Sequence, residues 1–101
     1  EFLFDIAITL NDFCTEYPEV HLNEVKAQAF LEAYETVRPL TTDEKACLEI
    51  YLAMAAARFW LMRLQVAQKN AQQGRTGDDI LQKNPQEMRN MLIERLKFVT
   101  A

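Results

Sequence analysis

The feature that most restricts the fold of this chain is one long helical stretch, residues 43–73, with clear signals at both ends. Thr41, followed by Glu44 three residues later, matches a capping box that starts a helix, and Gly74 is a typical helix stop. Apolar residues fall on every side of this helix, and the alanines at 55–57 permit close backbone approach. The rest of the chain is therefore predicted to pack around more than one of its faces.

Three shorter amphipathic helices are predicted around the long one, from apolar residues that recur every three or four positions. Asn23 is a suitable N-cap for the second helix, and Pro39 closes that helix. Asn84 and Pro85 combine a cap with a first-turn proline at the start of the fourth. No segment alternates apolar and polar residues between turn signals, so no β-strand is predicted. The predicted helices span residues 3–15, 24–38, 43–73 and 85–99.

The fold class that follows is all-α, a four-helix bundle-like piece that forms one domain over residues 1–101. The fourth helix has a narrow apolar stripe and is expected on the outside of the bundle. The members of this stripe are Met88, Met91, Leu92, Arg95, Leu96 and Val99.

The charge of the chain argues against nucleic acid and membrane surfaces as partners. Its net charge is −4, with eleven acidic and three basic side chains in residues 1–50 and four acidic and eight basic ones in residues 51–101. An acidic chain has no general attraction to phosphate backbones or anionic lipid. No stretch of about 20 apolar residues occurs. The two halves, at −8 and +4, are expected to attract each other or complementary neighbours.

The sequence contains no recognisable metal or nucleophile site. Cys14, Cys47 and His21 are isolated, without a second ligand at metal-binding spacing, so no zinc site is predicted. Lone cysteines in apolar stretches are typical of a reducing compartment, which predicts a cytoplasmic protein. The chain has no Ser to act as a nucleophile, and the glycines of the Gly74–Gly77 segment do not have the spacing of a phosphate loop.

Two groups of polar residues are the candidate binding positions. Asp5, Thr9, Asp12 and Glu16 fall on one face of the first predicted helix. This face is interpreted either as solvated or as presenting Asp12 to the cationic group of a ligand.

Trp60 and Arg63 share an edge of the long helix, three residues apart, whereas Arg58 points more than a quarter-turn away. An arginine in so apolar a helix must reach water or an anion. Arg63 is expected either to pair with an acid of the first two helices or to bind a carboxylate in a pocket.

Several segments, taken in order, resemble homoserine kinases of the aminoglycoside-phosphotransferase-like superfamily. The most specific are Tyr-x-x-Val-Arg-Pro at residues 34–39 and Arg-Phe-Trp-Leu-x-Arg-Leu at residues 58–64. The full set of matching segments comprises residues 4–8, 10–14, 33–41, 57–64 and 83–85.

The resemblance implies the C-terminal helical subdomain of an enzyme that transfers the ATP γ-phosphate to the hydroxyl of L-homoserine in threonine biosynthesis. The family's nucleotide-binding lobe, His-Gly-Asp loop and metal-binding Asp have no counterpart in this chain. ATP and Mg²⁺ are therefore implied only for a complete enzyme, no catalytic residue carries over, and the chain alone is expected to be inactive. The positions expected to border the acceptor site are Asp12, Trp60 and Arg63, while Asp5 is expected to be structural.

The chain begins directly in apolar sequence without an initiator Met, as expected for a piece of a longer protein whose exposed apolar faces drive self-association.

Two other functions remain open from the sequence. A free-standing helical module that dimerises or clasps a partner helix would use the same faces. A helical bundle that binds a small molecule without chemistry is the third possibility.

Overall fold

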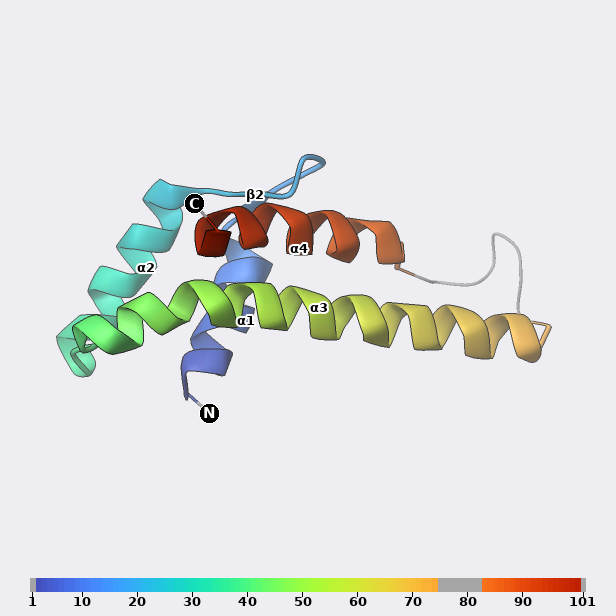
Figure 1. Cartoon of the computed structure of the whole chain (residues 1–101), viewed down its shortest axis with the longest axis horizontal. Coiled ribbons are helices and arrows are strands. Elements are labelled where there is room, and N and C mark those ends of the chain that lie inside the picture. The colour runs from blue at the N-terminus through green and yellow to red at the C-terminus, as the bar shows by residue number, and fades with distance from the viewer. Residues whose placement is uncertain (1, 75–82, 101) are drawn as a thin grey trace.

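Four helices dominate the computed structural model, which describes residues 2–74 and 83–100 (Figure 1). The predicted all-α fold is confirmed, and each predicted helix lies within two residues of an observed one at both ends. The elements are α1 (Phe2–Phe13), β1 (Thr15–Glu16), β2 (His21–Leu22), α2 (Glu24–Val37), α3 (Thr42–Gln72) and α4 (Pro85–Thr100).

The prediction that the chain has no β-strand is wrong. After α1 ends at Phe13, the chain turns back to form an antiparallel pair in which Thr15 faces Leu22 and Glu16 faces His21. Each strand has only two residues, which is too short to show the alternation that reveals a strand in sequence. We call residues 15–22 the hairpin.

Local capping signals explain why the helix boundaries were predictable. The side chain of Asn23 accepts a hydrogen bond from the Lys26 amide at 3.0 Å, at the start of α2. Thr41 and Glu44 exchange both bonds of a capping box, at 3.0 and 2.9 Å, at the start of α3. Gly74, with a φ of 70°, occupies the left-handed conformation that commonly follows a helix end.

Helix α3 is the structural centre, as predicted. Its 31 residues span about 46 Å at a rise of about 1.5 Å per residue, and it runs along the longest axis of the molecule (Figure 1). It packs mainly against α4 and α1. Ala55 and Ala56 are fully buried, which is consistent with the close approach that the alanine run permits. No helix in residues 2–74 and 83–100 combines the length and apolar character that crossing a membrane requires.

Two core clusters lie along α3. The first joins α1, α2 and the N-terminal half of α3, and includes Leu3, Leu10 and Leu52. The second joins the hairpin, the middle of α3 and α4, and includes Val20 and Met91. The second cluster forms the base of the site described below.

Helix α4 contributes more to the core than its narrow stripe suggested. Met91 and Arg95 are almost completely buried, whereas Leu96 and Val99 at the C-terminal end of the stripe are each 41% exposed. The expectation of an outer helix therefore holds only for the C-terminal part of α4, because the hairpin covers the part that carries Met91 and Arg95.

Candidate functional site

A cleft of about 440 Å³ lies where four parts of the fold meet: the end of α1, the hairpin, the middle of α3 and the start of α4. Its polar lining combines two cations, one carboxylate, one phenol and one amide, and its apolar lining comes from α3 and α4. The residues that line it are Asn11, Asp12, Tyr17, Ala56, Phe59, Met62, Arg63, Val66, Lys83, Met88 and Met91.

The cleft contains two of the three predicted binding residues. Asp12 comes from α1 and Arg63 from α3, so residues 51 positions apart in sequence line one cavity. Asp12 is exposed at the last turn of α1. The predicted helical face of four polar residues does not extend to Glu16, because Glu16 lies in β1 and accepts a hydrogen bond from Asn23 at 2.6 Å.

Arg63 has structural partners as well as a place in the cleft. Its Nη1 donates to the backbone oxygen of Asn84 at 2.7 Å and to Oε1 of Glu87 at 2.9 Å. The side chain is 16% exposed. The expected ion pair with an acid of the first two helices is wrong in its partner, because Glu87 belongs to the first turn of α4. Arg63 therefore anchors the start of α4 to α3 beside the cleft.

Trp60 is not among the residues that line the cleft. It packs against the second core cluster with Phe59 and Leu92. Its indole Nε1 is buried and has no hydrogen-bond partner within the described part of the chain. Three members of that cluster, Ala56, Met88 and Met91, line the cleft, so Trp60 packs against residues of the cavity wall without lining it.

Sequence reasoning missed Tyr17 and Lys83, which both line the cleft. Tyr17 lies just beyond the end of the first helix, and the hairpin, which the sequence did not predict, brings it to the cleft. Burial raises the pKa of the Tyr17 hydroxyl, and the negative charges of Glu87 and Asp12 act in the same direction, while Arg63 opposes them. Tyr17 is therefore a neutral hydrogen-bonding group near pH 7.

Arg95 is the other polar residue whose role the sequence concealed, because it falls within the apolar stripe of α4. It is fully buried behind the cleft, and burial lowers the pKa of its guanidinium to about 10. It remains charged near pH 7. Asn11, which lines the cleft, accepts a hydrogen bond from its Nε at 2.8 Å.

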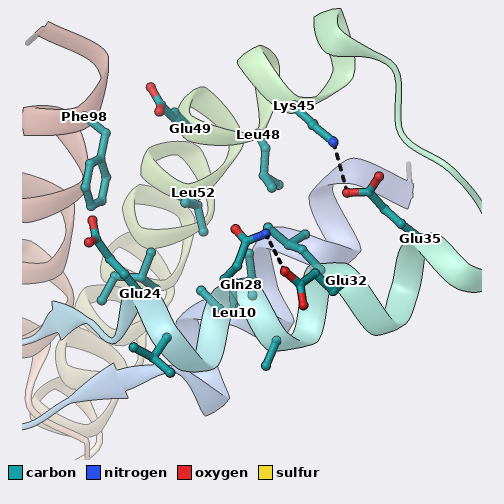
Figure 2. A pocket seen from close by; sticks show the side chains of 15 residues that line it. Leu10, Glu24, Gln28, Glu32, Glu35, Lys45, Leu48, Glu49, Leu52 and Phe98 are labelled. Atoms are coloured by element: carbon teal, nitrogen blue, oxygen red, sulfur yellow. Dashed lines mark hydrogen bonds and ion pairs between the residues drawn. The ribbon is translucent and has the colours of Figure 1, made fainter.

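Other depressions contain different chemistry. A larger one, of about 850 Å³, lies between α2, α3 and the end of α4, with a leucine floor and an acidic rim (Figure 2). Lys45 in that rim pairs with Glu35 at 3.2 Å. A third depression, of about 630 Å³, contains Asp5 and Arg58. Arg58 therefore lies apart from Arg63, as its helical position predicted.

No metal-binding group of three or more His, Cys, Asp or Glu side chains occurs in residues 2–74 and 83–100. Cys14 is buried and Cys47 is exposed. His21 has a neighbour after all, because its Nδ1 lies 3.2 Å from Oε2 of Glu94. Of the Gly74–Gly77 segment, only Gly74 belongs to the described residues.

Comparison with known proteins agrees with the resemblance seen in the motifs. The chain is 48% identical over 63 residues to the homoserine kinase of Polaromonas naphthalenivorans (strain CJ2), which covers 62% of this chain and 20% of that relative. It is 44% identical over 64 residues to the homoserine kinases of Burkholderia mallei (strain SAVP1) and Burkholderia pseudomallei (strain K96243), which covers 63% of this chain and 19% of each relative.

The chain spans about a fifth of the length of the curated relatives it matches. No family model and no solved structure matches it. The predicted resemblance is nevertheless confirmed: over 63 of its 101 residues this chain is similar to homoserine kinases, and its matched part corresponds to one fifth of such an enzyme.

Proposed function

We propose that this chain forms the acceptor side of a homoserine kinase, the part that holds L-homoserine while the phosphoryl group is transferred. The observation that supports this function best is the cleft that contains both Asp12 and Arg63. An amino acid presents an ammonium and a carboxylate a few ångströms apart. A site that recognises it needs one anion and one cation in the same cavity.

Within this proposal, Arg63 and Lys83 bind the carboxylate, and Asp12 accepts hydrogen bonds from the ammonium. Nη1 of Arg63 keeps its hydrogen bonds to Glu87 and Asn84 in this proposal, so the ligand carboxylate binds the remaining nitrogens of the guanidinium. The apolar side chains of the cleft cover the methylene chain, and Trp60 packs against the core cluster that contains two of them, Met88 and Met91. The Tyr17 hydroxyl offers a neutral donor to the carboxylate or to the reacting hydroxyl.

The transfer step itself needs groups that this part of the chain does not offer. A kinase binds ATP with Mg²⁺ and uses an Asp to orient the acceptor hydroxyl. In the family that this chain resembles, these groups belong to the nucleotide-binding lobe and the His-Gly-Asp loop, which have no counterpart in this chain. The proposal assigns ATP, Mg²⁺ and the catalytic Asp to those parts of a complete enzyme. Threonine biosynthesis remains a prediction that follows from the same resemblance, and a cytoplasmic location remains a prediction that follows from the lone cysteines.

The proposal is tested by comparing the 101-residue chain with a complete enzyme that contains it. The complete enzyme is expected to form ADP in a homoserine-dependent way, and the chain alone is expected to form none above the level without protein. Coupled measurement of ADP release, with homoserine and other small alcohols as acceptors, decides this. Homoserine-dependent ADP formation by the chain alone, or a complete enzyme indifferent to homoserine, contradicts the proposal.

A second candidate function, a helical association module, is favoured by an exposed apolar face of α3. Ile50, Met54, Leu61 and Leu64 lie on one side of the helix, and each is 42–56% exposed. Contiguous apolar surface of this kind is typical of an interface. In this proposal the stripe pairs with the same stripe of a second copy when nothing else covers it.

Self-association of the chain through this stripe is expected to weaken when Leu61 is replaced by Glu. The substitution puts a charge in the middle of the apolar contact, which should raise the dimer dissociation constant by about tenfold or more. Sedimentation velocity over a concentration series measures the change. Gln86→Glu adds a charge on exposed α4 surface and serves as the matched control. A chain that stays monomeric at every concentration contradicts the module.

A further inference from the structure

The most unusual polar group in the fold is the side chain of Arg95, which is fully buried and donates its hydrogen bonds to three neutral acceptors. Its Nε donates to Oδ1 of Asn11 at 2.8 Å. Its Nη1 donates to the backbone oxygen of Val20 and its Nη2 to Oγ1 of Thr15, both at 2.9 Å. The guanidinium thus uses all three of its nitrogens to hold α1 and the hairpin against α4.

These acceptors are themselves fixed to the rest of the fold. Nδ2 of Asn11 donates to the backbone oxygen of Leu52 in α3 at 3.1 Å. Oγ1 of Thr15 donates to the backbone oxygen of Asn11 at 2.5 Å. Arg95 therefore lies at the centre of a network that joins α1, the hairpin, α3 and α4.

The network lies directly behind the cleft. Asn11 lines the cleft and immediately precedes Asp12. Thr15 and Val20 lie on either side of Tyr17, which also lines it. Each segment that brings a polar group of the hairpin or α1 into the cleft is thus held by a hydrogen bond to Arg95.

The backbone of the hairpin also depends on this contact. Val20 has a φ of 59°, in the left-handed region that a β-branched residue rarely adopts. Its side chain is buried and its carbonyl accepts from Arg95. Burial of the side chain and this hydrogen bond both favour a turn geometry that the isolated segment would resist.

We infer that Arg95 is a positioning residue for the acceptor cleft, which sets where Asp12 and Tyr17 lie relative to Arg63. This inference rests on the proposed function. Burying a guanidinium whose hydrogen bonds all go to neutral groups is costly, because the charge loses its hydration, whereas an apolar side chain of similar volume has no such hydration to lose. A planar guanidinium, in contrast, directs three donors at fixed angles, which neither an apolar side chain nor the single ammonium of Lys can do.

The test in a complete enzyme is Arg95→Lys, which keeps the charge and removes the planar fork. KM for homoserine is expected to rise by about tenfold, which is the effect of losing about one charged hydrogen bond. KM for ATP is expected to change by less than about twofold. Arg89→Lys, at an exposed position of the same helix, is the matched control. Leu3→Ala destabilises the first core cluster and controls for stability alone, so it should leave both KM values near normal.

A second measurement on the 101-residue chain does not depend on activity. With fluorotyrosine at the three tyrosines and Tyr17→Phe to assign the signals, Arg95→Lys is expected to move or broaden the ¹⁹F resonance of Tyr17 and leave those of Tyr34 and Tyr51 in place. If Arg95→Lys does not fold, Thr15→Val removes one acceptor of the network, keeps the side-chain shape, and should give the same pattern with a rise in KM of about threefold.

The outcomes separate the inference from the function on which it rests. If Asp12→Asn raises KM for homoserine and neither Arg95→Lys nor Thr15→Val does, the inference is overturned and the proposed function stands. An unmoved Tyr17 resonance in both variants also overturns it. A third outcome is that the Tyr17 resonance moves in Arg95→Lys, while KM for homoserine stays normal in both Asp12→Asn and Arg95→Lys. The proposed function then fails, and the segment that Arg95 holds has no role in binding the acceptor.

Discussion

Under the proposed function, replacing Arg63 by Ala in a complete enzyme that contains this chain is expected to lower kcat/KM for homoserine by about 30- to 1000-fold. The loss of one charged hydrogen-bonding partner in a desolvated site costs about 2–4 kcal/mol, and each 1.36 kcal/mol is a factor of about ten. Asp12→Asn is expected to act in the same direction, because it removes the charge opposite the ammonium. Steady-state kinetics with homoserine and ATP varied separately should show normal dependence on ATP.

The control for this prediction comes from the second role of Arg63. Arg63→Ala also removes the ion pair with Glu87 and the hydrogen bond to Asn84, so it can act through the position of α4. Glu87→Gln removes the ion pair and leaves Arg63 in place. If Glu87→Gln lowers kcat/KM for homoserine as much as Arg63→Ala, the contribution of Arg63 is structural. If it leaves kcat/KM within a few-fold of normal, the loss in Arg63→Ala belongs to the ligand.

Replacing Arg95 by Met is expected to lower the free energy of unfolding of the chain by about 2–4 kcal/mol. Its acceptors on Asn11 and Val20 would lose a buried donor and the acceptor on Thr15 a partly buried one, and an unsatisfied buried group costs about 1–3 kcal/mol. The sum is reduced because Met no longer buries a charge. Urea denaturation followed by circular dichroism measures the change.

The same substitution at exposed Arg89 should change the free energy of unfolding by less than about 0.5 kcal/mol, since surface replacements away from special contacts have small effects. If Arg95→Met has the same free energy of unfolding as the parent chain, the hydrogen-bond network of Arg95 does not stabilise the fold. Thr15→Val, which removes one acceptor, should fall between the two, with a loss of about 1 kcal/mol.

Arg63 and Arg95 show what a helical pattern in the sequence can and cannot predict. Arg63 was recognised as a charged group in an apolar helix, and it does line the cleft. Arg95 has the same character but was counted as part of an amphipathic stripe, because position on a helix tells which way a side chain points and not what it meets. Only the packed hairpin reveals that Arg95 is completely buried.

The sequence by itself determined the four helices and the resemblance to homoserine kinases. Helix starts and stops depend on contacts within a few residues, such as the capping box of Thr41 and Glu44, and such contacts are written directly in the sequence. The tertiary structure alone decided which polar groups share a cavity. Arg63 meets Glu87 from 24 positions away, and Asp12 joins Arg63 across two helices. Contacts of this kind depend on how the helices pack against one another. Helical periodicity shows which residues share a face of one helix, but it does not show which face of another helix lies next to them.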